Sequence, residues 1–188
     1  MIRIAHESPK AIFDKVNDVT DYSYALVHLF EEDKEYFLQF KNAINEGREV
    51  ILDNSIFELG KSFDPNSYAF WINELKPDWY IIPDVLEDAK GTMEQLGEWN
   101  RKWGRSVRTG ARTIGVVQGK TLEDAIGCYE YMDKVSGVDM IAISFDYSFY
   151  EDMVPHPNKY VSWMLGRVAF LGILVDRGIL NENKPHHL

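Results

Sequence analysis

The chain has 188 residues, 45% of them apolar, and a formal net charge of −10, which predicts one globular domain over residues 1–188 with a buried core. Its single cysteine, Cys128, excludes a disulfide framework and a cysteine-based zinc site within these residues. No apolar run approaches the roughly 20 residues that cross a membrane, so we expect a cytoplasmic protein without a membrane partner.

Strand-like apolar runs alternate with helix-like segments along the chain. The predicted strands cover, in order, residues 1–6, 22–30, 48–55, 78–85, 112–119 and 138–148. The predicted helices cover residues 31–47, 65–76, the later part of 86–103, 121–137 and 161–178, the last after a loop over 151–160. Asp64 before Pro65, and Thr121 three residues before Asp124, are typical of helix N-termini. Residues 186–188 resemble the opening of one more strand.

Four of the strand-like runs end on a carboxylate or an amide: Asp53, Asp84, Gln118 and Asp146. The steps between them are 31, 34 and 28 residues, about the length of one strand, one loop and one helix. This spacing predicts an α/β fold of successive βα units in a parallel sheet or barrel. Because the carboxyl ends of such strands form the active face, we expect these four residues to line a polar, catalytic pocket.

Each candidate also has a structural interpretation. Asp53 is of a type common in turns, Asp84 could cap the helix that follows it, and Asp146 could pair with a local hydroxyl. His6 and His28 are expected near strand ends, where a single histidine is more often structural than a ligand or an acid–base group.

A guanine base matches this set of polar groups. Carboxylates can accept hydrogen bonds from N1 and N2 of guanine, while a glutamine amide can donate one to O6. A divalent metal could use the same carboxylates, but the chain lacks well-spaced histidine pairs. Two alternatives therefore stay open: a metal-assisted hydrolase using His6, Asp53, Asp84 and Asp146, and a non-catalytic base-binding module.

One basic stretch interrupts the acidic composition. The segment 101–112 contains no acidic residue, follows Trp99 and includes Trp103. Its cations are Arg101, Lys102, Arg105, Arg108 and Arg112. The net charge argues against strong nucleic-acid binding overall, so this stretch is either a solvated helix end or a local phosphate contact.

Three segments carry a resemblance to a known family. They read ILDNSIFELG, YIIPDVLEDAKGT and IGVVQGKTLEDAIGCYEYM, and lie within residues 48–145. In that order and spacing they resemble the tRNA-guanine transglycosylases and their phage and bacterial relatives, which insert 7-deazaguanines into DNA or tRNA. The resemblance implies a (β/α)₈ barrel that exchanges guanine for a deazapurine through a covalent glycosyl-enzyme intermediate on an Asp.

Matching motif by motif, the resemblance implies a role for each candidate. Asp53 falls on the family's pocket Asp and general base, and is the predicted catalytic residue. The predicted base-binding residues are Asp84, Gln118, Gly119 and Asp146, with Gln118 on the family's base-reading glutamine. The predicted nucleic-acid contacts are Arg101, Lys102, Arg105 and Arg108. The partners are then a purine or deazapurine base and tRNA or DNA, and a homodimer is compatible with this.

The chain departs from the family in several places. After Asp53 the chain reads Asn54, Ser55, Ile56 and Phe57, so the glycine pair of the family's Asp-Ser-Gly-Gly-Phe motif is absent, and the strand ending at Asp146 is bulky where the family is glycine-rich. The nucleophilic Asp and the zinc cluster would fall beyond Leu188, so we expect no metal or cofactor within this chain. With 188 residues against the roughly 200–250 of a full barrel, the expected fold is a TIM-type (β/α) barrel, incomplete or truncated after about six βα units.

Overall fold

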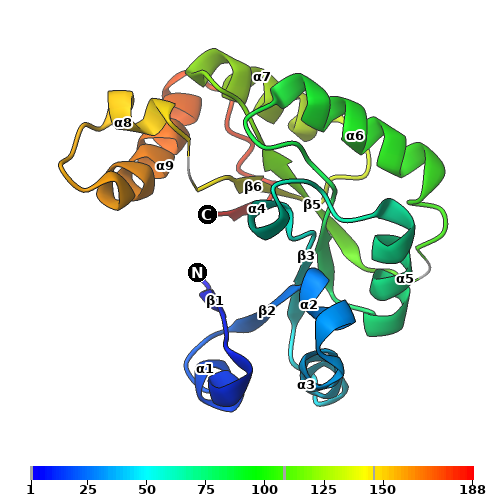
Figure 1. The fold of residues 1–188 in the computed structure, drawn as a ribbon. Coiled ribbons are helices and arrows are strands. Elements are labelled where there is room, and N and C mark those ends of the chain that lie inside the picture. Colours follow the sequence, from blue (N-terminus) through cyan, green and yellow to red (C-terminus); the bar gives the residue numbers. More distant parts are fainter. Residues whose placement is uncertain (1, 108, 146) are drawn as a thin grey trace. The chain divides into compact units, whose positions relative to one another are not determined.

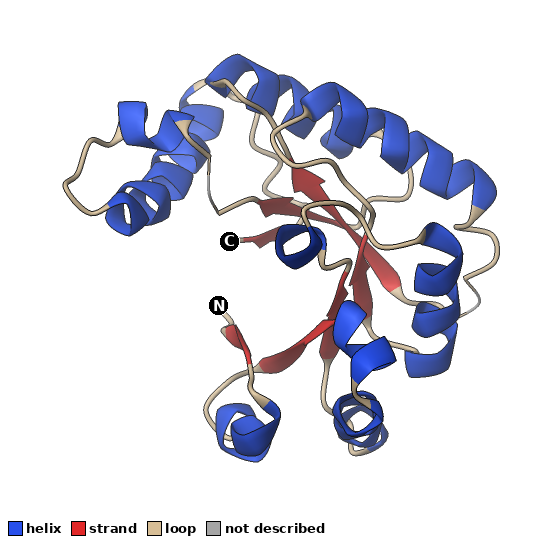
Figure 2. Cartoon of the chain, viewed as in Figure 1, coloured by secondary structure: helices blue, strands red, loops and turns tan. Residues whose placement is uncertain are grey.

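The computed structural model describes residues 2–107, 109–145 and 147–188 and has an α/β fold, in which parallel strands alternate with helices along the chain (Figures 1 and 2). The chain divides into two compact units, neither of them continuous in sequence. Unit 1 comprises Met1–Pro83 and Trp99–Thr113, and unit 2 comprises Asp84–Glu98 and Ile114–Leu188. The predicted alternation of strands and helices is therefore confirmed.

Unit 1 contains four parallel strands whose order in the sheet is their order in the chain. They are β1 (Ala5–Glu7), β2 (Tyr22–Leu26), β3 (Val50–Asp53) and β4 (Trp79–Ile81). Between them lie η1 (Lys10–Ile12), α1 (Phe13–Asn17), α2 (His28–Glu32), α3 (Lys34–Asn45), α4 (Ile56–Leu59) and α5 (Pro65–Leu75). The register pairs Leu26 with Asp53, so β2 and β3 end at the same carboxyl edge.

Unit 2 contains three parallel strands, again in chain order. They are β5 (Arg112–Val117), whose first two residues belong to unit 1, β6 (Met140–Ile143) and β7 (His186–His187). The helices are α7 (Leu122–Lys134), α8 (Phe149–Met153) and α9 (Lys159–Asp176). A further helix, α6 (Ala89–Lys102), begins in unit 2 and ends in unit 1. The strand expected at the end of the chain is thus present as β7.

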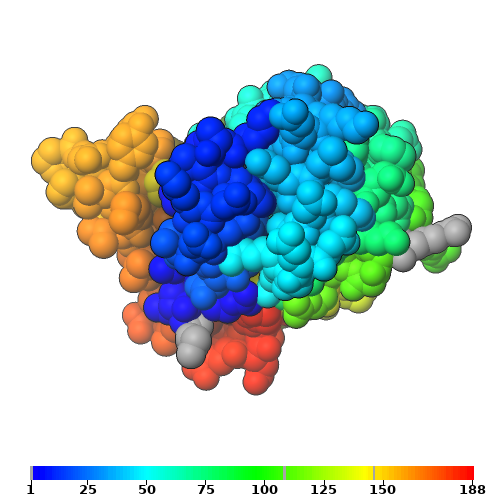
Figure 3. Space-filling view, turned by 90° about the horizontal axis from the view of Figure 1, so that it is seen from below, coloured from blue at the N-terminus to red at the C-terminus, as the bar shows by residue number. Residues whose placement is uncertain are grey.

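Aromatic side chains build the core of unit 1. Tyr68 on α5 is fully buried, and its hydroxyl donates to the carbonyl oxygens of Leu52 (3.1 Å) and Ile81 (2.8 Å), which ties α5 to β3 and β4. On another side, the Phe13 ring packs edge-on against Phe40 at 4.8 Å, joining α1 to α3. These two helices lie side by side in Figures 1 and 3.

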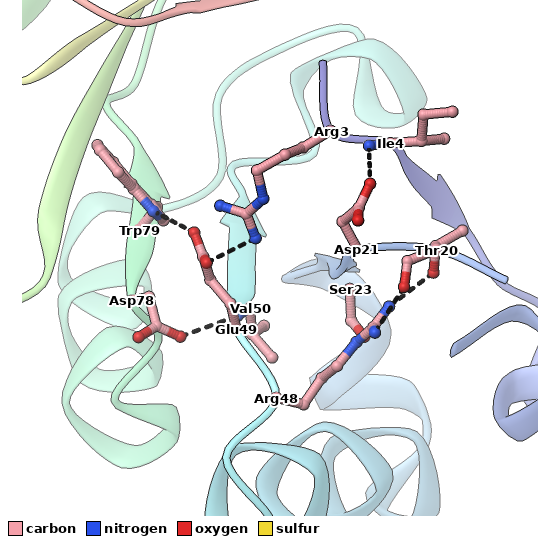
Figure 4. A network of polar contacts seen from close by, with 10 residues as sticks. All are labelled: Arg3, Ile4, Thr20, Asp21, Ser23, Arg48, Glu49, Val50, Asp78 and Trp79. Atoms are coloured by element: carbon pink, nitrogen blue, oxygen red, sulfur yellow. Dashed lines mark hydrogen bonds and ion pairs between the residues drawn. The ribbon is translucent and has the colours of Figure 1, made fainter. Parts of the chain in front are cut away.

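A polar network holds the amino edge of the strands in unit 1 (Figure 4). Glu49, just before β3, accepts from Arg3 (2.7 Å) and from the indole nitrogen of Trp79 (2.8 Å). Asp78, just before β4, accepts from the backbone nitrogen of Val50 (2.9 Å). Arg48 donates to the carbonyl and hydroxyl oxygens of Thr20. The amino edge is therefore occupied by structural contacts, as is usual for the edge opposite an active face.

Helix caps follow the predicted signals. The Asp64 carboxylate accepts from the backbone nitrogen of Ser67 (2.8 Å), with Pro65 as the first helical residue of α5. The Thr121 hydroxyl accepts from Asp124 N (3.2 Å) at the start of α7. The helix expected over 31–47 begins only at Lys34, because Asp33 caps it through bonds from Glu35 N and Tyr36 N.

Two element predictions were wrong in detail. The strand expected over 22–30 ends at Leu26, and His28 starts the helix α2 instead, because the backbone of Val27 is already helical. The first residues of the loop expected over 151–160 belong to a short helix, α8, which ends at Met153. Gly166 on α9 allows α9 to pack closely against α8. A Cβ there would lie 2.4 Å from the Cβ of Tyr150, so only glycine lets the two helices approach so closely.

None of the described helices is both long enough and apolar enough to cross a membrane.

Candidate functional site

Asp84 and Gln118 form a buried pair in unit 2. Asp84 lies three residues after the end of β4 in the chain, and Gln118 directly follows β5. Only 2% of Asp84 and 1% of Gln118 is exposed, and the Gln118 side-chain nitrogen donates to Asp84 Oδ2 at 2.7 Å. The structure thus brings together two of the predicted base-binding residues, which are 34 positions apart in the chain.

The Gln118 amide has a fixed orientation. Its Oε1 accepts from the backbone nitrogen of Glu87 at 2.9 Å, while its Nε2 donates to the carboxylate, so exchanging the two atoms would break both bonds. Among the described residues, Nε2 makes no second hydrogen bond. Glu87 itself has a left-handed backbone (φ 55°), a conformation that costs a non-glycine residue about 1–2 kcal/mol. Strain of this kind is concentrated at functional sites.

The helix-cap interpretation of Asp84 is wrong, because Asp88 has that role. The Asp88 carboxylate accepts from the backbone nitrogen of Gly91 at 2.9 Å, and α6 begins at the next residue after Asp88. The buried Thr92 holds the intervening turn, since its hydroxyl accepts from Val85 N (2.9 Å) and donates to Val85 O (3.1 Å). The Asp84 carboxylate instead accepts from Gln118.

Cys128 and Tyr147 complete the surroundings of the pair, and sequence reasoning missed both. The Cys128 sulfur accepts from Gln118 N at 3.5 Å. Burial raises the pKa of the Cys128 thiol to about 11; the Gln118 N–H opposes this shift and the Asp84 charge adds to it. Burial, followed by the neighbouring Tyr150, Cys128 and Asp84, also raises the pKa of Tyr147 well above its ordinary value. Both groups are neutral at physiological pH.

Gly119 has a packing role at the end of β5. An added Cβ would lie 2.7 Å from Ala125 N and 3.0 Å from the Asp124 Cβ, so the missing side chain lets β5 end directly against the first turn of α7. Its predicted contact with a base stays a prediction.

Asp53, the predicted catalytic residue, belongs to unit 1 and ends β3. Its Oδ2 accepts from the Tyr24 hydroxyl at 2.5 Å and its Oδ1 from Ser55 N at 2.5 Å. The second bond joins a carboxylate to the backbone two residues later, so the turn interpretation of Asp53 is confirmed. Burial, then the Asp53 charge, raises the pKa of Tyr24 well above its ordinary value, which keeps that hydroxyl protonated as a donor.

The residues after Asp53 form a tight, buried turn. Ser55 is fully buried and left-handed (φ 59°), the conformation that favours glycine. The buried Asn54 supports it: its side-chain nitrogen donates to Ile82 O (3.1 Å) and its oxygen accepts from Ile56 N (3.0 Å). The Ser55 hydroxyl in turn accepts from the backbone nitrogen of His28 (3.3 Å).

Of the remaining candidates, Asp146 and Arg108 lie outside the described residues. The His6 ring is within hydrogen-bonding distance of the Glu7 carbonyl oxygen (2.7 Å), and the side chain is exposed. Among the residues that the structure describes, no group of three or more His, Cys, Asp or Glu side chains is placed to hold a metal ion.

The basic stretch lies in unit 1 beside α5. Arg101, Lys102 and Arg105 are exposed. The stretch is anchored by a bond from the Trp103 indole to Asn66 (2.9 Å), and it ends where Arg112 stacks on Trp79, 3.6 Å from the ring centre. The phosphate contact predicted here stays a prediction.

Comparisons with protein-family models and with curated proteins return no match to this chain.

Proposed function

We propose that this chain recognises guanine or a 7-deazaguanine and is the base-binding part of a TIM-type transglycosylase that inserts such a base into nucleic acid. The observation that carries the proposal is the buried bond between Gln118 and Asp84, with the amide fixed by Glu87 N. A ligand with several N–H donors suits a carboxylate at this position, because carboxylate oxygens only accept hydrogen bonds.

The geometry matches the edge of a guanine base in three respects. The fixed amide has one N–H that makes no bond to a described residue, suited to a carbonyl oxygen such as O6. The Asp84 carboxylate is the type of group that accepts from the ring N–H and the exocyclic amine of guanine. Neutral Cys128 and Tyr147 beside the pair keep the site free of competing charge.

As the resemblance implies, Asp53 is proposed to act as a general base. Its carboxylate is oriented by Tyr24 and by Ser55 N, and is partly exposed. A carboxylate held by two donors keeps a defined position, which a general base requires.

Calorimetric titration with guanine and with a 7-deazaguanine tests the proposal. Replacing Gln118 with Leu removes the donor and leaves Asp84 without its partner, so we expect binding to weaken by about 1–3 kcal/mol. Asp84→Asn should have a comparable effect, because it removes an acceptor of two base N–H groups. Gln39→Leu makes the same exchange on α3 of unit 1 and should leave affinity unchanged. Unaltered affinity in both site variants, with native circular dichroism, would contradict the proposal.

A further inference from the structure

Aromatic rings and cations, half-buried or exposed, lie against one another along α9 in unit 2. We call this surface the cation–aromatic strip: Phe145 after β6, and Lys159, Tyr160, Trp163 and Arg167 on α9. Phe145 and Tyr160 are 38% and 54% exposed. Trp163 meets both rings edge-on, with centroid distances of 5.5 Å to Phe145 and 5.6 Å to Tyr160.

The two cations of the strip lie against these rings. The Lys159 ammonium is 4.8 Å from the centre of the Trp163 ring, and the Arg167 guanidinium is 4.7 Å from that of Phe145. Neither cation has an ion pair among the described residues. Arg167 Nε is in addition buried without a hydrogen-bond partner in that part of the chain.

Among the described residues, an acidic side chain that contacts the strip is Glu151 on α8, which accepts from the indole nitrogen of Trp163 at 3.2 Å. The Trp163 ring is thus positioned by Glu151 as well as by the two neighbouring rings.

The strip lies at the carboxyl edge of the strands in unit 2. The register pairs Val117 of β5 with Ile143 of β6, so the residues that follow them, Gln118 and Ser144, leave the sheet at the same edge. Phe145 is the next residue after Ser144. Because α9 follows β6, its first turns, with Lys159 and Trp163, begin at this edge as well.

We propose that the cation–aromatic strip binds a single-stranded segment of nucleic acid next to the base site. Base faces would stack on Phe145, Tyr160 and Trp163, while Lys159 and Arg167 neutralise backbone phosphates, the combination that single-stranded nucleic acids require. The inference rests on the proposed function, because an enzyme that exchanges a base must take the nucleotide out of its stack. A duplex offers no free base faces and is bound less well.

Fluorescence anisotropy of the full chain with a labelled 12-nucleotide single strand, and with its duplex, tests the inference over a range of salt concentrations. We expect the single strand to bind more tightly than the duplex. The double variant Lys159→Gln/Arg167→Gln should flatten the salt dependence by about 1.4, or 0.7 for each phosphate that is no longer neutralised. Trp163→Ala should weaken binding about 5- to 100-fold, while Trp163→Phe keeps most of it.

The matched control is Lys90→Gln/Lys134→Gln, which makes the same change of charge on exposed side chains of α6 and α7 in unit 2. It should leave binding unchanged. Equal effects of the two double variants, or equal binding of single strand and duplex, would overturn the inference. Self-association that Trp163→Ala abolishes, without oligonucleotide binding, would assign the strip to a second copy of the chain and also overturn it.

The binding of oligonucleotide by the strip and the binding of a free base by the proposed site can be tested separately. The strip variants should bind free guanine with unchanged affinity, because a free base carries no phosphate and does not depend on stacking along a strand. Loss of free-base binding in Gln118→Leu together with strip variants that bind oligonucleotide normally would support the base site and reject the strip.

Discussion

At the scale of single residues, two glycines in unit 2 differ in whether neighbouring atoms leave room for a side chain. Gly119 and Gly127 are eight positions apart, one before α7 and one within it. An added Cβ would collide with the backbone of Ala125 at Gly119, whereas nothing lies within 4 Å of it at Gly127. The same substitution at the two positions should therefore have opposite effects.

We predict that Gly119→Ala destabilises the protein by about 1–3 kcal/mol, because the backbone of α7 must move to admit the methyl group. Gly127→Ala should stabilise it by about 0.5–1 kcal/mol, because alanine loses less conformational freedom in a helix. Urea unfolding followed by circular dichroism measures both. If both substitutions change the free energy of unfolding by the same amount and in the same direction, Gly119 is not packed against α7.

Two single residues adopt a backbone conformation that is rare for their type. Ser55 and Glu87 take left-handed backbones without being glycine, and each lies beside a predicted site carboxylate or amide. Sequence offers no sign of this, because neither residue type favours that conformation.

At the scale of elements, the strands of unit 1 are held at their amino edge by charge pairs rather than by packing alone. Glu49 is the centre of this network, since Arg3 and the Trp79 indole both donate to it. The hydrogen bond from Arg3, and then that from Trp79, lowers the pKa of Glu49 against the opposing effect of burial. The bonds therefore favour the charged form in the folded protein.

Because the pKa of Glu49 is lowered in the folded state, its contribution to the free energy of unfolding should fall as the pH falls. The stability from ionised Glu49 is fully present above the ordinary pKa of 4.5 and is lost as the pH falls through the lower value of the folded state. We predict that Glu49→Gln costs up to about 1 kcal/mol at pH 7, since the group is partly exposed, and that the difference from wild type vanishes below that range. Unfolding at pH 7 and at pH 3 tests this; an equal difference at both would exclude the ionic contribution.

At the scale of the whole molecule, the net charge of −10 opposes nucleic-acid binding, whereas the two cationic surfaces favour it. General repulsion weakens any encounter with nucleic acid, so binding depends on local cations. The basic stretch of unit 1 and the cation–aromatic strip of unit 2 both supply such cations. Both contain a cation over a Trp ring, since Lys102 lies 5.5 Å from the centre of the Trp103 ring, but the strip adds the exposed rings of Phe145 and Tyr160.

We predict that Arg101→Glu/Arg105→Glu reduces the salt dependence of oligonucleotide binding by about 0.7–0.9 for each phosphate that is no longer neutralised. Affinity for free guanine should be unchanged, because the free base has no phosphate. Lys34→Glu/Lys61→Glu, on exposed side chains of unit 1, is the matched control for charge. If both variants show the same salt dependence as wild type, the basic stretch is a solvated surface.

The sequence by itself determined the order and type of most elements and the polar residues at the strand ends. Apolar periodicity and capping residues are local signals, so Asp64, Pro65 and Thr121 were sufficient to locate two helices. Even the prediction that Gln118 and Asp84 share a site depended on local information, because parallel strands of regular spacing bring their carboxyl ends to one edge.

Only the tertiary structure decided which groups meet and in what state. It showed that Asp88 rather than Asp84 caps α6, that Glu87 fixes the Gln118 amide, and that Cys128 lies beside it. It also brought Phe145 against side chains of α9 such as Arg167, about twenty residues later in the chain. These contacts join residues far apart in sequence, and their strength depends on burial and geometry, neither of which a local pattern records.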